Sequence, residues 1–269
     1  MLFDKLGFER RNMKKTKIEI NVEEFPKELR YLFKNATVYD SSCHSNASVY
    51  YLDTGYYIKT DALHELEKEA NLNRLFDALG LGVEVIAYVC ADRDYLVTRE
   101  AVGEDLTHFL QDPEQLCAIL ASSLRNLHAQ PIGGMPMSFR HQRYLESANG
   151  DYNDGCYDES ILIDRYTISS KEEAWNIMQA NKSLLKADTL IHGDACLPNI
   201  IQHDGAFSTF IDFNLAGVGD RHIDLYWAIW SLQYNLKTSA YTDLFLDLYG
   251  RDNFNEDMLR VVAAFELFG

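Results

Sequence analysis

The sequence predicts an α+β protein in two parts: a small antiparallel sheet with one main helix in residues 13–102, and a larger, mostly helical part in residues 103–269. Strand-like runs fill the first part, and Asp53-Thr54-Gly55 between two of them has the composition of a hairpin turn. In the second part, most apolar residues recur at helical spacing. Residues 99–103 interrupt both patterns, so we place the hinge between the parts there.

The first part carries the signals of a sheet and its helix in order. The strand-like runs are Thr37–Tyr39, Ser48–Leu52, Tyr56–Lys59, Val83–Val89 and Tyr95–Thr98. Between the third and the fourth run, Leu63–Phe76 has an apolar stripe at helical spacing, and Gly80 closes that helix. We therefore expect one sheet with a single long helix against it.

The second part is read mainly as helices. Asp112 and Pro113 are typical of a helix start, because an aspartate caps the first turn and proline lacks the N–H that this turn leaves unpaired. The helical patterns are Pro113–Leu127, Arg143–Ala148, Lys171–Met178, Asp224–Leu232, Tyr241–Tyr249 and Glu256–Phe268. The fourth pattern is apolar almost all round, so we expect that helix to be buried.

The chain is organised around Leu190–Ile201, where two apolar strand-like runs enclose a short polar loop. The loop contains His192, Asp194 and Asn199 in the pattern H-x-D-x-x-x-x-N, and Asp212 ends a later strand-like run. This pattern resembles the metal-and-base apparatus of the protein-kinase-like fold. The alternative is a His-Gly-Asp turn with a purely structural role.

A more specific resemblance lies in the same residues. The loop His192–Ile200 resembles the catalytic loop of aminoglycoside 3′-phosphotransferases, and Gly193 stands where protein kinases carry an arginine. The segments Gly205–Asp212 and Gly217–Asp224 continue the match. The chain is thus identified as a member of that family, with a resemblance that covers most of its length.

The resemblance implies a two-lobed protein-kinase-like fold and phosphoryl transfer from ATP or GTP with Mg²⁺. Asp194 would be the base that orients the acceptor hydroxyl and takes its proton. Asn199 and Asp212 would bind Mg²⁺, a hard cation that prefers oxygen ligands. We expect three further polar residues to support this apparatus: His192, Asp220 and Asp224.

The resemblance also assigns the nucleotide-binding residues. Lys59, at a strand end, would clamp the α- and β-phosphates, and Glu69 would pair with it, with Glu65 as the fallback. Ser45 would contribute to a glycine-poor phosphate loop. The hinge would bind the adenine edge through backbone groups of Glu100, Ala101 and Val102. The alternatives are a solvated lysine, a solvated helix face and a plain hairpin tip.

The substrate site is expected to be acidic, because family members contact the ammonium groups of the antibiotic with carboxylates. Asp154, Asp158 and Glu159 lie in an acidic stretch that would reach over the antibiotic, although a solvated loop explains the stretch as well. Glu266 near the chain end is a further candidate.

The match weakens at this site. Known 3′-phosphotransferases end in an acidic motif, whereas here Phe265 replaces the aspartate and Gly269 moves the terminal carboxylate by one residue. Tyr234 also stands near a position where the family usually has an acid. Each lost carboxylate removes a charge-assisted contact of about 1.5–3 kcal/mol.

Composition limits the partners. The formal net charge of −16 argues against nucleic acid, whose binding depends on basic patches, and favours a cationic small molecule. The five cysteines have no C-x-x-C spacing, so we expect reduced thiols and a cytoplasmic protein. No apolar run has the length of a membrane span. Residues 1–12 are expected to be a disordered extension before Met13, and the protein to be a monomer or weak dimer.

The sequence therefore predicts an aminoglycoside O-phosphotransferase that confers antibiotic resistance. Two other hypotheses stay open. One is a kinase of the same fold acting on choline, an amino sugar or a macrolide. The other is a nucleotide-binding module without catalysis, against which stands the presence of Lys59, Asp194, Asn199 and Asp212 together.

Overall fold

The computed structural model describes residues 15–42, 47–133 and 139–268. By contacts, the chain divides into unit 1, comprising Met1–Val102 and Thr209–Asn214, and unit 2, comprising Gly103–Ser208 and Leu215–Gly269. The break after Val102 falls in the predicted hinge. Thr209–Asn214, which the sequence analysis assigned to the larger part, groups with unit 1 instead. The reason is local: the Phe210 N–H donates to the Leu81 carbonyl oxygen over 2.9 Å. The predicted extension 1–12 lies outside the described residues.

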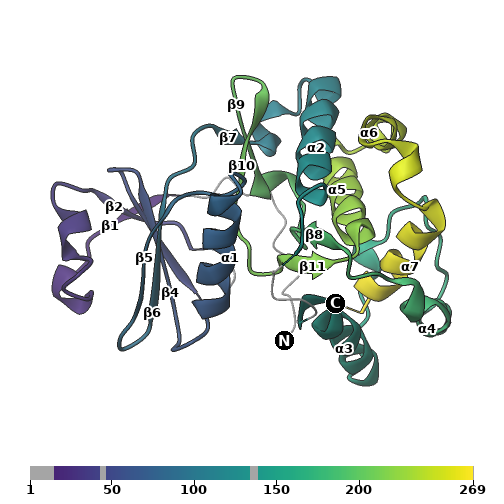
Figure 1. Cartoon of the computed structure of the whole chain (residues 1–269), viewed down its shortest axis with the longest axis horizontal. Coiled ribbons are helices and arrows are strands. Elements are labelled where there is room, and N and C mark those ends of the chain that lie inside the picture. The colour runs from purple at the N-terminus through teal and green to yellow at the C-terminus, as the bar shows by residue number, and fades with distance from the viewer. Residues whose placement is uncertain (1–14, 43–46, 134–138, 269) are drawn as a thin grey trace. The chain divides into compact units, whose positions relative to one another are not determined.

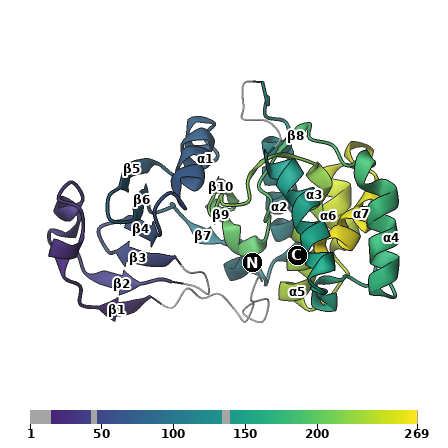
Figure 2. The same cartoon turned by 90° about the horizontal axis from the view of Figure 1, so that it is seen from below.

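Unit 1 is built on a six-stranded sheet with the order β1-β2-β3-β4-β6-β5 (Figure 1). Neighbouring strands are antiparallel. The strands are β1 (Thr16–Ile18), β2 (Val38–Asp40), β3 (Ser48–Leu52), β4 (Tyr56–Asp61), β5 (Val85–Cys90) and β6 (Asp94–Arg99). Its long helix is α1 (Glu67–Ala78), which packs on β5 (Figure 2).

Strand alternation gives the sheet of unit 1 two different faces. One face forms a core in which Val38, Leu52, Ile58 and Val97 are buried together with Phe25. The opposite face of β4 carries Tyr57 and Lys59. Helix α1 covers part of that second face, because a small cluster joins Leu66 and Ala70 to Leu96, the cross-strand partner of Lys59.

Helix α1 has defined ends. The carboxylate of Asp94, fully buried on β6, accepts a hydrogen bond of 2.9 Å from the Leu66 N–H immediately before the helix. Asp94 therefore acts as an N-terminal cap supplied by the sheet. At the other end, Gly80 has φ +69°, the left-handed conformation that commonly ends a helix. The predicted helix is confirmed, but it begins after Glu65.

Unit 2 is mostly helical, as expected. Its helices are α2 (Pro113–His128), α3 (Phe139–Asn153), α4 (Lys171–Asn181), α5 (Arg221–Leu236), α6 (Thr242–Tyr249) and α7 (Glu256–Glu266). Helices α2, α5 and α6 lie side by side, and α7 packs on α4 and α5 (Figure 1). Asp112 caps α2 through the Gln115 N–H, as the sequence predicts. Helix α3 contains Asp151–Asn153, so the first residues of the predicted acidic loop are helical.

Two small sheets complete the fold. Strand β8 (Thr189–Ile191) pairs with β11 (Gly217–Gly219), and β9 (Ile200–His203) lies between β7 (Glu104–Asp105) and β10 (Ala206–Phe210). Short 3-10 turns link these elements, among them η5 (Glu159–Ile161) and η7 (Leu197–Asn199). In the part of the chain that the structure describes, no helix is long and apolar enough to cross a membrane.

Candidate active site

The loop between β8 and β9 is anchored by buried apolar residues on both sides. Leu190 and Ile191 before it, and Ile200 after it, are fully buried. The turn η7 closes the loop, and its Leu197 N–H donates to the Ser231 hydroxyl of α5 over 3.0 Å. A polar loop held in this way keeps its side chains in one arrangement, which a catalytic group needs.

Asp194 and Asn199 lie in direct contact within this loop. The Asn199 side-chain nitrogen donates to the Asp194 carboxylate over 2.9 Å and to the Asp194 carbonyl oxygen over 3.0 Å. These two bonds fix which way the Asn199 amide points. Its side-chain oxygen makes no hydrogen bond with the described residues, so it can serve as a ligand. Asp194 is half-buried, with its carboxylate reachable from solvent.

Gly193 is required by the shape of the loop. Its φ of +82° is left-handed, and a Cβ atom placed there would lie 2.1 Å from the Leu215 carbonyl oxygen. No side chain fits at that distance, because backbone rather than a flexible side chain is the obstacle. The glycine that distinguishes this loop from that of protein kinases therefore has a steric cause.

Gly193→Ala should accordingly move the loop. We expect kcat to fall at least tenfold and the free energy of unfolding to drop by about 1–3 kcal/mol, the usual cost of such strain. Steady-state kinetics and urea titration measure the two effects. Gly133→Ala is the matched control, since its Cβ would meet nothing within 4 Å. Equal activity of the two variants would contradict the assignment.

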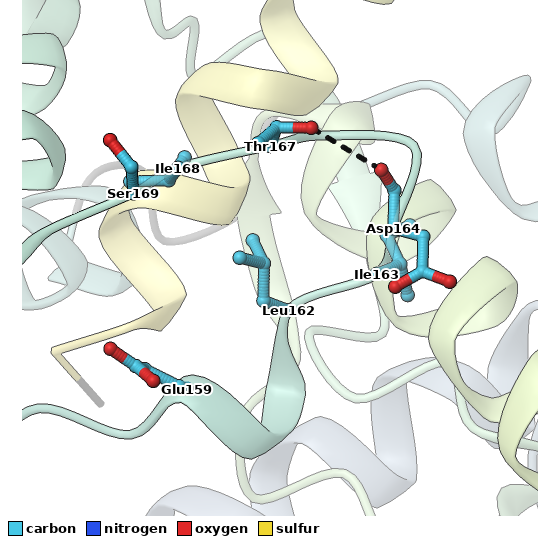
Figure 3. Close-up of a pocket in the computed structure, with 7 residues that line it drawn as sticks. All are labelled: Glu159, Leu162, Ile163, Asp164, Thr167, Ile168 and Ser169. Atoms are coloured by element: carbon cyan, nitrogen blue, oxygen red, sulfur yellow. Dashed lines mark hydrogen bonds between the residues drawn. The ribbon is translucent and has the colours of Figure 1, made fainter.

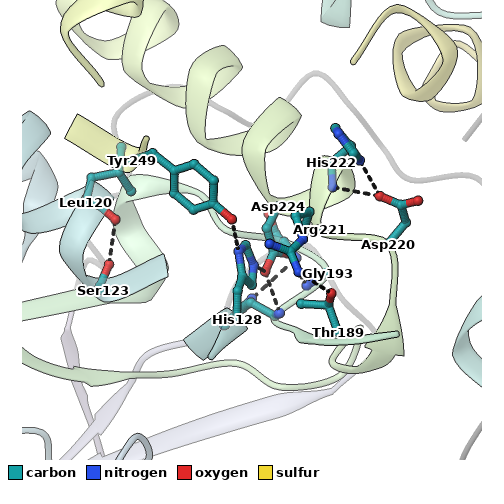
Figure 4. Close-up of polar contacts among 12 residues, drawn as sticks. Leu120, Ser123, His128, Thr189, Gly193, Asp220, Arg221, His222, Asp224 and Tyr249 are labelled. Carbon is teal, nitrogen blue, oxygen red and sulfur yellow. Dashed lines mark hydrogen bonds and ion pairs between the residues drawn. The ribbon is translucent and has the colours of Figure 1, made fainter. Parts of the chain in front are cut away.

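Asp224 on α5 holds the backbone of the loop (Figure 4). One carboxylate oxygen accepts the His192 N–H over 2.8 Å, and the other accepts the Gly193 N–H over 2.7 Å. His128 Nε2 lies 3.1 Å from the first oxygen. Burial by itself would raise the pKa of Asp224, but the hydrogen bond and charge of His128 and the contacts with His192 outweigh it and hold that pKa below its usual value. The predicted support of the loop by Asp224 thus has a geometric basis.

His192 and Asp220 have more local roles. The fully buried His192 accepts the Asp194 N–H at Nδ1 over 3.3 Å, which orders the turn around the aspartate. Asp220 caps α5 through the His222 N–H and also accepts the Lys186 N–H over 2.8 Å. These contacts support the start of α5 and the segment leading into β8. Of the two aspartates, Asp224 is the one whose carboxylate accepts N–H groups of the loop itself.

In unit 1, Lys59 lies between two carboxylates. Its ammonium is 2.7 and 2.9 Å from the two oxygens of Glu69 and 3.9 Å from Asp212 Oδ1. Burial would lower the pKa of Lys59, but the charges of Asp212 and Glu69 more than offset it and raise that pKa. Lys59 therefore stays cationic, a charge state that suits the predicted role as a phosphate ligand. Glu65, the fallback partner, is exposed and precedes α1.

Asp212 follows β10 by two residues and adopts φ +65°, which is rare for a residue other than glycine. Its side chain is 47% exposed although it faces Lys59. Strained backbone of this kind is concentrated at functional sites. The conformation keeps a carboxylate beside Lys59 while leaving it accessible to a ligand.

Glu69→Gln tests the pairing. The substitution replaces one of the two carboxylates beside the Lys59 ammonium with a neutral amide, so we expect kcat/KM for the nucleotide to fall roughly 30-fold, the equivalent of about 2 kcal/mol for a charge-assisted contact. Glu65→Gln is the control, because that glutamate is exposed. A nucleotide titration of both variants separates the effects, and identical constants would refute the role of Glu69.

The structure adds Tyr57, which the sequence analysis did not single out. It lies two residues before Lys59 on the same face of β4, and its ring centroid is 5.0 Å from that of Tyr51. An aromatic ring on the same strand face as Lys59 makes Tyr57 a further candidate for contact with a ligand. The signal was present in Tyr-Tyr-Ile-Lys, because residues i and i+2 of a strand share a face.

Some of the groups predicted to bind the adenine or the phosphates already have hydrogen-bond partners within the protein. The Glu100 N–H donates to the Gly55 carbonyl oxygen over 2.9 Å, so that donor is already used. The Glu100 carboxylate accepts the Tyr51 hydroxyl over 3.0 Å. Ala101 is half-buried, and Val102 is 61% exposed. Ser45 lies outside the described residues.

The predicted substrate carboxylates differ in their surroundings. Asp154 is exposed. Asp158 caps the turn η5, accepting the Ser160 N–H over 2.9 Å, and its own N–H donates to the Leu267 carbonyl oxygen. Glu159 lines a pocket of about 360 Å³ with Asp164 at the opposite end (Figure 3). No residue of the catalytic loop lines this pocket.

Near the end of α7, Glu266 is only 5% exposed. Burial, followed by the charge of Glu266, raises the pKa of Tyr226. Tyr234 on α5, where an acid was expected from the resemblance, stacks on Trp230 with ring centroids 5.0 Å apart. Lys237 lies over the Tyr234 ring at 4.0 Å. The region therefore presents fewer accessible carboxylates than the resemblance implies.

Comparison with known proteins places this geometry in a family. The model of the phosphotransferase enzyme family matches residues 41–264. The chain belongs to this family. A probable aminoglycoside 3′-phosphotransferase of Lactococcus lactis is 40% identical over 259 residues, which cover 94% of this chain and 98% of the relative. An aminoglycoside 3′-phosphotransferase of Niallia circulans is 32% identical, covering 65% of this chain and 67% of the relative.

Solved structures support the fold of this phosphotransferase. The aminoglycoside phosphotransferase APH(3'')-Id of Streptomyces rimosus has a TM-score of 0.70 at 18% identity, covering 84% of this chain and 91% of its own. An aminoglycoside 3′-phosphotransferase of type VIII has a TM-score of 0.66 at 23% identity, covering 85% and 91%. The predicted α+β, kinase-like fold is therefore confirmed, as is the family resemblance of the catalytic loop.

Proposed function

We propose that this phosphotransferase moves the terminal phosphate of a magnesium nucleotide to a hydroxyl group of an aminoglycoside, with Asp194 as the base. The main observation in support of the proposal is the pair of hydrogen bonds from Asn199 to Asp194, in a loop whose flanking apolar residues are buried. A carboxylate held in this way can accept the proton of an alcohol and orient its oxygen for in-line attack. The 40% identity to a probable aminoglycoside 3′-phosphotransferase supports the 3′-type.

The donor side of the reaction belongs to Lys59, Glu69 and Asp212. Lys59, kept cationic by the two carboxylates, would bind nucleotide phosphates. The accessible carboxylate of Asp212 and the side-chain oxygen of Asn199 are suitable ligands for Mg²⁺, which takes few protein ligands and fills its shell with phosphate and water. When bound, Mg²⁺ would neutralise charge on the phosphates. The proposed donor is ATP or GTP, and Tyr57 would stack on its base.

The acceptor is proposed to be cationic. The net charge of −16 raises the local concentration of a polycation near the protein. Asp154 and Glu159 are exposed and are proposed to contact its ammonium groups. Asp158 and Glu266 are proposed for the same role. In this structure Asp158 caps η5 and Glu266 is buried.

We also propose that the enzyme works in the cytoplasm, where nucleoside triphosphates are available. Among the described residues, four cysteines form no disulfide: Cys90, Cys117, Cys156 and Cys196. A monomer or weak dimer without a nucleic-acid or membrane partner is proposed on the basis of the acidic composition.

A substrate panel tests the proposal. Release of ADP or GDP would be followed with kanamycin, streptomycin, choline and a macrolide as acceptors, each with magnesium ATP or GTP. We expect acceptor-dependent release of the nucleoside diphosphate with kanamycin. With choline and the macrolide, we expect release that is at most slightly above background. Faster turnover of choline or the macrolide would establish the alternative kinase, and nucleotide binding without any transfer would establish the non-catalytic module.

A further inference from the structure

A chain of buried polar side chains continues beyond Asp224, away from the catalytic loop (Figure 4). His128 is the last residue of α2 and Tyr249 is the last residue of α6. The Tyr249 hydroxyl lies 2.8 Å from His128 Nδ1, and the rings meet edge to face with centroids 5.8 Å apart. Tyr249 is 1% exposed and His128 8% exposed. All of these residues belong to unit 2.

The partners of the His128 ring are fixed on both sides. Asp224 can only accept, so His128 Nε2 donates to it. On the other side of the ring, Nδ1 is hydrogen-bonded to the Tyr249 hydroxyl. Burial raises the pKa of Tyr249 to about 12 despite the opposing charge of Arg221, so the hydroxyl keeps its proton at neutral pH. The result is a continuous series of hydrogen bonds from Tyr249 through His128 to Asp224.

We propose that Tyr249 is a positioning residue for the base Asp194: it holds the His128 ring in one orientation, and His128 and Asp224 together fix the backbone of the loop. The inference rests on the proposed function for the identity of the reaction. The physical link between His128 and the loop is a single oxygen of Asp224. The Asp224 oxygen that receives His128 also receives the His192 N–H, so rotation of the imidazole changes the bond that holds the loop.

Helix α6 thereby gains a role that its position does not suggest. It supplies no residue to the loop itself. Its last side chain, Tyr249, is hydrogen-bonded to His128, which in turn contacts the loop-binding carboxylate of Asp224. Without the hydroxyl, the buried His128 Nδ1 loses its hydrogen-bond partner, and the ring can swing toward water or another partner. One neutral hydrogen bond contributes about 0.5–1.5 kcal/mol, which sets the size of the expected effect.

Tyr249→Phe tests the inference with a matched control. We expect kcat for acceptor phosphorylation to fall about three- to tenfold while KM for the nucleotide stays unchanged. Tyr166→Phe removes another buried tyrosine hydroxyl of unit 2, one that finds no hydrogen-bond partner among the described residues, and should leave kcat unchanged. Equal kcat values for wild type and Tyr249→Phe would overturn the proposal.

A double-mutant cycle distinguishes positioning through His128 from simple packing of α6. In His128→Gln, the side-chain amide can still donate to Asp224 but offers no imidazole nitrogen to Tyr249. Adding Tyr249→Phe to this variant should therefore cost little further kcat. If the two losses multiply, Tyr249 acts independently of His128 and the proposal fails.

A second measurement does not depend on the acceptor. Hydrogen exchange of the backbone amides of residues 192–194 should be faster in Tyr249→Phe than in wild type or Tyr166→Phe, with exchange elsewhere unchanged. Uniformly faster exchange would indicate general destabilisation and would overturn the positioning role. If loop exchange changes as expected but no aminoglycoside is phosphorylated, the proposed function fails and the positioning of the loop stands.

Discussion

Asp194→Asn should reduce kcat by a factor between about 10² and 10⁴, with nucleotide affinity nearly unchanged. The asparagine oxygen can still accept the Asn199 amide, so the loop keeps its shape. What is lost is the proton acceptor, and general base catalysis typically contributes an effect of that size. Lys59, which is proposed to bind the phosphates, and its ion-pair partner Glu69 are untouched.

This separation makes the experiment decisive for the role of Asp194. Isothermal titration with magnesium ATP measures affinity, a coupled assay measures kcat, and thermal unfolding checks that the fold is intact. Activity within threefold of wild type would contradict the role of base. A parallel loss of nucleotide binding would mean that Asp194 acts on the donor rather than on the acceptor.

Asp224→Ala should be the most destabilising single substitution among the residues of this network. It leaves the N–H groups of His192 and Gly193, and the imidazole of His128, without their acceptor in a fully buried position. Removing one partner from a buried charged network costs about 3–5 kcal/mol. Urea titration should therefore show a large loss of unfolding free energy, accompanied by loss of activity.

The same carboxylate sets an expected pH dependence. Because the folded pKa of Asp224 lies below its ordinary value of about 4, its contribution to stability is complete above that value and is lost as pH falls toward the folded pKa. Asp224→Asn does not titrate at this position, so its stability should fall less steeply than that of wild type as the pH is lowered below about 4. Parallel slopes for the two proteins would show that Asp224 is not the group responsible.

The catalytic loop could be predicted because its information is local. Two apolar runs, a glycine and a fixed spacing between Asp194 and Asn199 all lie within twelve consecutive residues, Leu190–Ile201. The loop forms as β8, the turn η7 and β9, and the side-chain contact between the two residues follows directly. The helices of both units were also predictable, since their apolar periodicity or caps are local signals.

Contacts between distant segments could not be predicted in the same way. Periodicity does not show that Tyr249 reaches His128, which is 121 residues away in sequence. The grouping of Thr209–Asn214 with unit 1 depends on a backbone bond to Leu81. Asp158 illustrates a missed local signal, because Asp-x-Ser is a capping pattern and the residue does cap η5.

The most direct test of the central claim is transfer of labelled terminal phosphate from magnesium ATP or GTP to a matched pair of aminoglycosides. Kanamycin B carries a 3′-hydroxyl, and tobramycin is the same scaffold without it. We expect one labelled phosphate on kanamycin B and none on tobramycin. The labelling of kanamycin B should be abolished in Asp194→Asn. Equal labelling of both antibiotics would contradict the 3′-type, and absence of label on kanamycin B would contradict the proposed function itself.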